Sequence, residues 1–282
     1  MSDTSRLSKH RRAALSLIGL ACATPVAIQT SHAEQPSDSP SSSESLWGDK
    51  TDIAVGFGAA VGPRYMGARE TRTLLAPSLS VSRGIFFADS LRGGGAEYLT
   101  DNGLYVSGAL QYDFGRQERN SSWRPGSDRL RGMGDVTGAT LANIHVSQAI
   151  TPWLSLDSEA ELRMAGYKRG NRYHLGLEST LLSNDTDSIT LGVHAHIGDQ
   201  RYNETYFGVN EQQHQSSRFS RFSPKSGVYA YSTSLDWQHS FNRHWTLLMG
   251  LNLMSFSDRA QHSPIVERDT SAAGFAMLDY LF

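Results

Sequence analysis

The stretch LSLDSEAELRM, residues 154–164, shows most clearly the alternation from which the fold is inferred. Leu154, Leu156 and Leu162 fall on one face of an extended chain, together with the small and apolar residues between them. The charged residues of the stretch fall on the opposite face, namely Asp157, Glu159, Glu161 and Arg163. Alternation with a period of two residues indicates a β-strand whose two faces meet different surroundings.

The same alternation recurs over most of the chain after Thr51. The clear segments are about ten residues long, which is the length that a tilted strand needs to cross a bilayer. The glycine-rich segment RGGGAEYL, residues 92–99, allows either a turn and a strand or one bent strand over 84–100. We expect twelve strands, at 52–61, 73–82, 84–91, 95–100, 104–114, 136–149, 153–165, 172–182, 188–198, 226–241, 245–256 and 271–282.

Three features favour a transmembrane barrel over a soluble antiparallel sandwich, which would also alternate. The polar face is charged and rich in glycine along consecutive strands, which suits a wet lumen. Aromatic residues cluster at the segment ends, as they do in interfacial girdles. Long polar connections at 62–72, 115–134, 199–225 and 257–270 alternate with tight turns. Short periplasmic turns and long external loops are typical of outer-membrane barrels.

The quoted sequence ends on AMLDYLF, residues 276–282, another alternating segment. Because lipid cannot satisfy the backbone of an unpaired sheet edge, we expect this last strand to close the barrel against the first. Tyr280 and Phe282 also resemble the signal by which outer-membrane proteins are recognised by the barrel-assembly machinery. We therefore predict an all-β fold, a closed antiparallel transmembrane β-barrel of about twelve strands, in the outer membrane.

Residues 1–33 are expected to be a secretory signal peptide. Basic residues precede an apolar run from Ala13 to about Ile28, and Ser31 and Ala33 fit the small residues of a signal peptidase site. A single membrane anchor is the alternative, but the run is short and is interrupted by a proline. We therefore expect export through the periplasm after cleavage.

The remaining chain is expected to form a disordered, Ser/Pro-rich periplasmic lead-in at 34–50 and the barrel at 51–282. The single cysteine, Cys22, lies in the expected signal peptide, so disulfides and thiolate metal sites are excluded from the exported chain. The formal net charge is −2, and removal of the signal would make the chain more acidic. This charge balance does not indicate a nucleic-acid partner.

Several motifs occur in the order in which a known family carries them. RYNETYFGVNEQQ at 201–213 is followed by SRFSPKSGVYA at 220–230, with YMG at 65–67, GD at 134–135 and SPIV at 263–266. Because these motifs span nearly the whole chain after the lead-in, the chain resembles the MipA/OmpV family. The resemblance rests most on four consecutive loop residues, Tyr206, Phe207, Gly208 and Val209.

This resemblance implies an outer-membrane barrel without catalytic residues. The family is named for a protein that interacts with a membrane-bound lytic transglycosylase, and that protein is taken to bring the transglycosylase together with a murein synthase. Other members look like porin-like proteins or adhesins. The resemblance thus implies a non-enzymatic scaffold for murein-remodelling enzymes, with a porin-like channel for small solutes or an adhesin acting through external loops as alternatives.

Eight polar residues are expected to face the lumen: Asp157, Glu159, Glu161, Arg163, His174, Glu178, His194 and His196. They could tune ion passage as charged pore rings do, or they could form an internal salt-bridge network that fills a narrow barrel. His194 and His196 share one strand face and could hold a metal ion with a third ligand such as Glu178 or His174. Neither G-x-S-x-G nor HExxH occurs, so we expect no catalytic residues, no metal and no cofactor.

Two external loops are candidates for binding. The loop at 115–132 carries five arginines and Trp123, and these could bind the phosphates of lipopolysaccharide or remain solvated without a ligand. The YFGV residues are expected to fold inward as a plug or rim contact, because exposed Tyr206 and Phe207 together would form a sticky patch.

Overall fold

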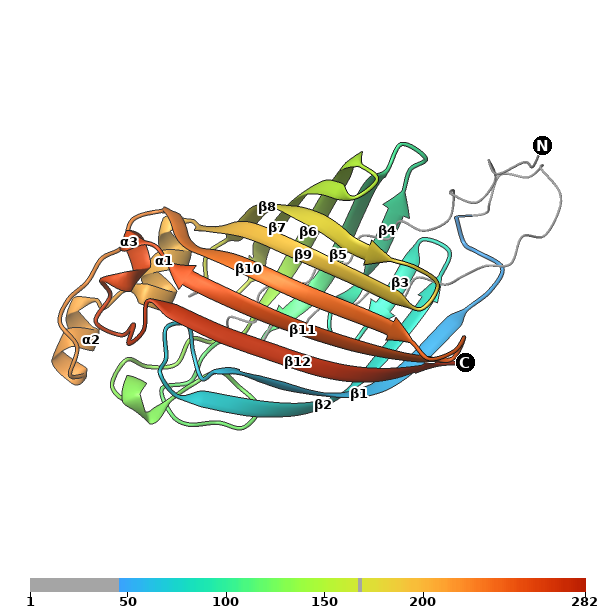
Figure 1. Cartoon of the computed structure of the whole chain (residues 1–282). Helices are drawn as coiled ribbons and strands as arrows, with labels where there is room; N and C mark the ends of the chain where they lie inside the picture. The colour runs from blue at the N-terminus through green and yellow to red at the C-terminus, as the bar shows by residue number, and fades with distance from the viewer. Residues whose placement is uncertain (1–45, 167–168) are drawn as a thin grey trace, which may run out of the picture.

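The computed structural model describes residues 46–166 and 169–282, so the expected signal peptide and most of the expected lead-in lie outside the described residues. No helix within these residues is long and apolar enough to cross a membrane. Four short helical segments are present: η1 (Asp128–Leu130), α1 (Gln200–Phe207), α2 (Glu211–Ser216) and α3 (Asp258–Gln261). The described residues otherwise form twelve strands: β1 (Asp52–Pro63), β2 (Thr71–Arg83), β3 (Phe86–Asp89), β4 (Gly93–Leu99), β5 (Leu104–Asp113), β6 (Ala139–Thr151), β7 (Leu154–Ala165), β8 (Arg172–Ser183), β9 (Asp187–Gly198), β10 (Gly227–Ser240), β11 (Trp245–Phe256) and β12 (Thr270–Leu281) (Figure 1).

The strands form one closed barrel in which each strand pairs antiparallel with its neighbours in sequence. β12 closes the barrel by pairing with β1, and Tyr280 lies opposite Val55 while Leu278 lies opposite Phe57. Closure satisfies the backbone hydrogen bonds of both terminal strands, which a sheet surrounded by lipid requires. The predicted fold class, the strand number and the closing pair are therefore confirmed.

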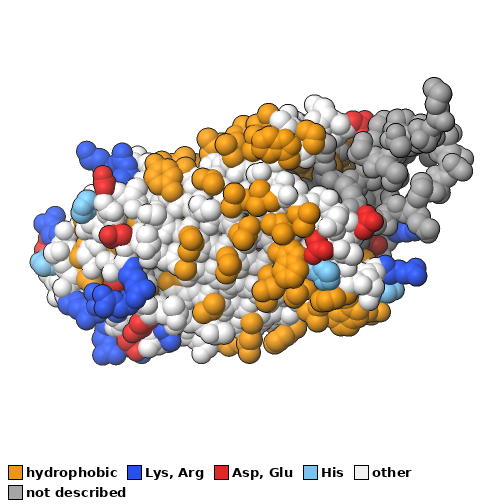
Figure 2. Space-filling view, viewed as in Figure 1, with side chains coloured by type: hydrophobic (Ala, Val, Ile, Leu, Met, Phe, Trp, Pro, Cys, Tyr) orange, Lys and Arg blue, Asp and Glu red, His pale blue; other side chains and the backbone are white. Residues whose placement is uncertain are grey.

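The side chains follow the alternation of the sequence, with the apolar face outward. On β11, for example, Leu251 is 64% exposed, whereas Leu248 and Met254 on the other face are buried. Figure 2 shows apolar side chains spread over the outer wall and Lys and Arg gathered at the end that carries α1 and α2. An apolar outer wall with charged ends is the distribution that a barrel needs in a bilayer.

The two ends of the barrel differ in their connections. Tight turns join the strands at the end where the chain leaves β12, which we call the short-turn end. Trp245, Tyr280 and Phe282 lie there in edge-to-face contact, with ring centroids 4.9 Å apart in each neighbouring pair. The other end, the long-loop end, carries the extended connections at 64–70, 114–138, 199–226 and 257–269, which agree with the predicted long loops to within a few residues.

The β3–β4 connection departs most from the expected alternation of loop lengths. β3 and β4 form a short hairpin joined by only three residues, 90–92, although this turn faces the long-loop end. Gly93 leaves the turn with φ of 83°, and a Cβ there would lie 2.0 Å from the carbonyl oxygen of Leu110. Glycine is therefore required, and 84–100 is a complete hairpin instead of one bent strand.

The short hairpin leaves part of β2 paired on one side only. β2 pairs with β3 only through Ser80–Arg83 but with β1 through Thr71–Ser82. Leu79 exchanges hydrogen bonds with Ser90 at the edge of the hairpin, so Pro77, two residues away, points its backbone at the same edge. Because proline has no N–H to donate, it suits an unpaired edge. The barrel wall is therefore shorter along the barrel axis between β2 and β5, because β3 and β4 are short.

Candidate functional site

Helix α1 lies at the long-loop end of the barrel and packs on its strands. Asp199 begins the helix by accepting a hydrogen bond from the backbone N–H of Tyr202, at 2.7 Å. The buried rings of Tyr202 and Phe207 pack on Tyr229 of β10, with centroids 5.5 and 5.4 Å from it. This apolar group, which we call the α1 plug, comprises Met66, Val136, Tyr202, Tyr206, Phe207, Tyr229, Ala230, Met254, Phe256 and Ala260.

A second apolar group, the loop cluster, ties the long connections together. The hydroxyl of Tyr65 donates to the carbonyl oxygen of Ile265 across 3.0 Å. Burial raises the pKa of Tyr65 well above its usual value, so its hydroxyl remains a donor. The loop cluster takes residues from all four long connections: Tyr65, Ala68, Leu130, Met133, Val209, Phe219 and Ile265.

An ionic layer lies between the α1 plug and the middle of the lumen. Arg169 and Arg172 both donate to the carboxylate of Glu161, and Arg169 also donates to Asp113. The hydroxyl of Tyr206 reaches the same Asp113 carboxylate at 3.2 Å, which links the layer to the plug. All of these side chains are buried, so each charge is stabilised by a partner of opposite sign.

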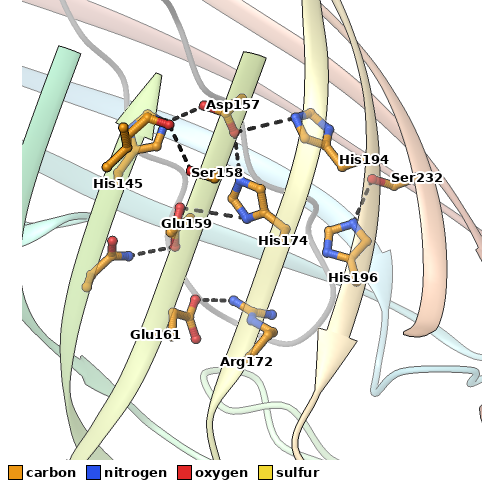
Figure 3. A network of polar contacts seen from close by, with 12 residues as sticks. His145, Asp157, Ser158, Glu159, Glu161, Arg172, His174, His194, His196 and Ser232 are labelled. Atoms are coloured by element: carbon orange, nitrogen blue, oxygen red, sulfur yellow. Dashed lines mark hydrogen bonds and ion pairs between the residues drawn. The ribbon is translucent and has the colours of Figure 1, made fainter. Parts of the chain in front are cut away.

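A histidine–carboxylate cluster lies next to the ionic layer and is drawn in Figure 3. Asp157 is its centre and is fully buried. One carboxylate oxygen, Oδ1, lies 2.8 Å from Nε2 of His174 and 3.7 Å from Nε2 of His194. The other, Oδ2, is hydrogen-bonded to Nε2 of His145. Three imidazoles from β6, β8 and β9 therefore meet one carboxylate of β7.

Further polar groups surround this cluster. Glu159 accepts a hydrogen bond from Nδ2 of Asn143 at 2.7 Å. Nε2 of His196 lies 2.8 Å from Oγ of Ser232, away from the carboxylates. On the other side, Oε1 of Glu178 lies 3.7 Å from Nε2 of His194. The cluster therefore spans the inner face of five neighbouring strands, β6 to β10.

Strand register explains why these residues meet. Asp157 on β7 lies opposite Gly176 on β8, which lies opposite His194 on β9. In the next inward-facing row, Glu159 lies opposite His174 and His174 lies opposite His196. Side chains two residues apart point to the same face of a sheet, so both rows enter the lumen.

Seven of the eight residues expected in the lumen are buried on its inner face. The eighth, Arg163, lies at the rim beside a bulge in the pairing of β6 with β7, and it donates to the carbonyl oxygen of Gly166 at 2.6 Å. It does not pair with Glu161. Four residues that were not among the eight expected lumen residues complete these contacts: Asp113, His145, Arg169 and Arg172.

Several arginines of the loop at 115–132 make contacts within the protein. Arg116 is buried and donates from Nη1 to the carbonyl oxygen of Tyr206, at 3.0 Å. Arg124 donates to the carbonyl oxygen of Phe114, and Arg129 pairs with Glu267 at 2.9 Å. Trp123 remains exposed. Fewer of the loop's five arginines are therefore available to bind phosphate groups than the sequence suggests.

A cavity of about 980 Å³ opens beside the α1 plug on the long-loop side. Its walls come from residues 132–136 and from α1, α2 and the segment that follows them. Arg201, Glu204 and Glu211 bring charges of both signs to this cavity. Val136 belongs both to this lining and to the α1 plug, so the cavity borders the plug.

Residues 55–282 match the model of a family described as MltA-interacting protein MipA. None of the curated proteins matches the chain. Among solved structures, an outer-membrane channel from Pseudomonas putida F1 is 10% identical, with a TM-score of 0.49, 87% of this chain covered and 100% of that chain. An anion-selective porin from Comamonas acidovorans is 11% identical, with a TM-score of 0.35 and coverage of 83% and 99%.

Pseudomonas putida OprB is 13% identical with a TM-score of 0.37, and 74% of this chain is covered. The present chain spans 59% of the length of that OprB chain. At these identities the likeness to the three structures concerns the barrel fold alone.

Proposed function

The chain belongs to the MipA family, and from this premise we propose that it is a non-enzymatic scaffold, an outer-membrane barrel that holds murein-remodelling enzymes at its periplasmic side. The long-loop end then faces the cell exterior and the short-turn end faces the periplasm. The family description names an interaction with MltA. We propose a lytic transglycosylase and a murein synthase as the partners of this chain. Outer-membrane lipid and lipopolysaccharide surround the barrel in this proposal.

The packing of side chains at the long-loop end is the observation that supports this proposal. The α1 plug and the loop cluster fill that end with apolar side chains, which include seven aromatic residues and three methionines. A porin requires a wet path between its ends, and rows of packed apolar side chains oppose the passage of ions. The charges of the ionic layer beneath the plug are also paired, because Arg169 and Arg172 both contact Glu161. A barrel built in this way is better suited to anchoring than to conduction.

The periplasmic side offers a surface for partners next to the lead-in. The backbone N–H of Ile85, in the β2–β3 turn, donates to the carbonyl oxygen of Leu46 at 3.0 Å. The ring of Trp47 lies against Phe86 with centroids 5.0 Å apart, and Trp47 is still 70% exposed. An exposed indole beside a turn is a typical anchor for a protein partner. We propose that 34–50 and the neighbouring turns contact the murein enzymes.

Co-purification tests the scaffold proposal. The full barrel, extracted in mild detergent, should retain a lytic transglycosylase, and Trp47→Ala should weaken that retention. Trp123→Ala, which removes an exposed indole at the opposite end, is the matched control and should retain the enzyme fully. Absence of the transglycosylase from the wild-type extract under mild conditions would contradict the proposal.

A porin-like channel is the second candidate, and the charged lumen is the observation that favours it. Glu159 and Glu161 lie on the inner wall, where neutralisation would change the selectivity of any current. Planar bilayers that contain the wild-type barrel and the Glu159→Gln variant test this candidate. A silent wild-type bilayer removes the channel and leaves the scaffold, whereas a current whose selectivity shifts in the variant would favour the channel.

A further inference from the structure

We propose that Asp157, His174 and His194 form a binding site for one divalent transition-metal ion of the Zn²⁺ class in the lumen, beneath the α1 plug. One ligand atom from each side chain lies within 4.8 Å of the other two, and all three residues are buried. Two imidazoles and a carboxylate are a common ligand set for zinc and for neighbouring first-row metals. The site is separate from the periplasmic surface that carries the proposed scaffold function.

The distances between the donor atoms suit a metal ion. Bonds of about 2.0–2.1 Å in a tetrahedral arrangement place neighbouring donor atoms about 3.3 Å apart. Oδ1 of Asp157 lies 2.8 Å from Nε2 of His174 and 3.7 Å from Nε2 of His194, on either side of that value. Small rotations of the side chains would place an ion between all three. Oε1 of Glu178 lies 3.7 Å from Nε2 of His194, beside the three donors.

Two glycines leave the space that the imidazole of His194 occupies. A Cβ at Gly176, which lies between Asp157 and His194 in the strand register, would be 2.2 Å from Cδ2 of His194. A Cβ at Gly192, on the same strand as His194, would be 2.7 Å from its Cε1. The imidazole of His194 therefore occupies space that the Cβ of any other residue at position 176 or 192 would fill. Its Nε2 is thereby directed to the carboxylates of Asp157 and Glu178.

The groups behind the three ligands resemble the surroundings of known metal sites. A metal-binding histidine usually has a carboxylate or carbonyl group at its second ring nitrogen, which fixes the orientation of the ring. Oε2 of Glu159 lies 3.9 Å from Nδ1 of His174, and the other oxygen of Glu159 is held by Asn143. His145 holds Oδ2 of Asp157 and leaves Oδ1 directed to the other two histidines.

Charge also favours a cation here. Asp157, Glu159 and Glu178 bring three carboxylates into one buried part of the lumen, and the neighbouring histidines are positive only when they are protonated. Buried carboxylates require a compensating charge. A divalent ion supplies it and allows His174 and His194 to bind as neutral imidazoles, which are the forms that coordinate metals.

His196 provides a matched control within the same cluster. Its ring centroid lies 6.1 Å from that of His174 and 6.5 Å from that of His194, and its Nε2 is directed to Ser232. It is as buried as the proposed ligands and lies on the same strand face as His194. It therefore differs from them in the direction of its donor atom, which is the property that the test requires.

Metal titration of the full barrel in detergent tests the proposal. After treatment with a chelator, the wild type should take up one Zn²⁺ per barrel in competition with a chromogenic chelator. His174→Gln and His194→Gln should each bind at least about tenfold more weakly, whereas His196→Gln should bind as the wild type does. Co²⁺ in place of Zn²⁺ should give the visible absorption of a four- or five-coordinate site, and this readout needs no variant. The heat-dependent shift of the folded barrel on electrophoresis shows whether each variant is folded.

Two results would overturn the proposal. One is a folded wild-type barrel that takes up no stoichiometric Zn²⁺ or Co²⁺ at micromolar concentrations. The other is a folded His174→Gln, His194→Gln double variant that binds the ion as tightly as the wild type.

Discussion

The guanidinium of Arg116 donates a hydrogen bond to the carbonyl oxygen of Tyr206, 90 residues further along the chain, at 3.0 Å. This contact ties the 114–138 connection to the last turn of α1, and both groups are buried. Arg116 thus joins the arginine-rich 114–138 connection, which the sequence suggests is solvent-exposed, to the α1 plug. The long connections are therefore parts of one packed cap.

Replacing Arg116 with Ala should loosen this cap without unfolding the barrel. A lost hydrogen bond to a charged donor that leaves a buried carbonyl oxygen unsatisfied costs about 1–3 kcal/mol. Limited proteolysis of intact cells or proteoliposomes should therefore cut the 199–226 connection faster in the variant. Arg119→Ala, in the same loop but exposed, is the control and should be cut at the wild-type rate. Equal cutting of all three proteins would show that the contact does not hold the cap.

Glu161 should be the most sensitive residue of the lumen to substitution. Glu161→Gln leaves Arg169 and Arg172 with an uncharged partner in a buried site, and breaking a buried ion pair costs about 3–5 kcal/mol. The free energy of unfolding in urea should fall accordingly. The exposed pair of Glu211 with Arg221 supplies the control, because Glu211→Gln should cost about 0–1 kcal/mol. A similar small loss in both variants would contradict the ionic layer as described.

Gly176→Ala should disturb the His194 imidazole. The new Cβ would lie 2.2 Å from Cδ2 of His194, so the ring must move away from Asp157, and overpacking costs about 1–3 kcal/mol. Zn²⁺ binding should weaken with it. At Gly108 an added Cβ meets no atom within 4 Å, so Gly108→Ala should leave both stability and Zn²⁺ binding unchanged. Unchanged binding in Gly176→Ala would mean that the glycine is not needed for the ring's position.

A charge on the outer wall should be far more costly than one on a loop. Leu251→Arg places a guanidinium on an apolar outward face, where arginine in a barrel costs about 2–4 kcal/mol at the bilayer midplane. Reversible folding into lipid vesicles measures this loss. Gln215→Arg, on exposed α2, should cost close to nothing. If the two variants lost the same free energy, the wall would not be in contact with hydrocarbon.

The alternation of residues 154–164 was enough to predict the wall, because strand pairing keeps the period of two that the sequence displays. Asp157, Glu159 and Glu161 consequently lie inside, as predicted. The rim was less predictable: a bulge near Arg163 interrupts the period, and Arg169 lies in a connection where no period exists. Asp113 and Arg172 lie at strand ends on the inward face, so the same alternation could have identified them.

Tyr206 and Phe207 were expected to fold inward, but the short β3–β4 hairpin and the helical form of α1 could not be predicted from local pattern. Three consecutive glycines in 93–95 have no side chains to show which face is inward, so strand length in that region is set by the turn at 90–92. Helix α1 is polar by composition, and its burial depends on Tyr229, Met254 and Phe256, which come from other strands. Tertiary contacts of this kind leave no periodic signal in the sequence.

Spin-label accessibility measures whether the apolar outer wall lies in lipid. The chain has a single cysteine, in the expected signal peptide, so Leu251→Cys, Asn252→Cys and Trp123→Cys each give one labelling position in the exported barrel. In proteoliposomes, the label at 251 should be relaxed by oxygen and protected from a water-soluble nickel chelate, whereas the label at 123 should show the reverse. The label at 252, on the lumen face, should respond less to oxygen than its neighbour at 251. If the nickel chelate reached the label at 251 as freely as the label at 123, the outer wall would not lie in lipid.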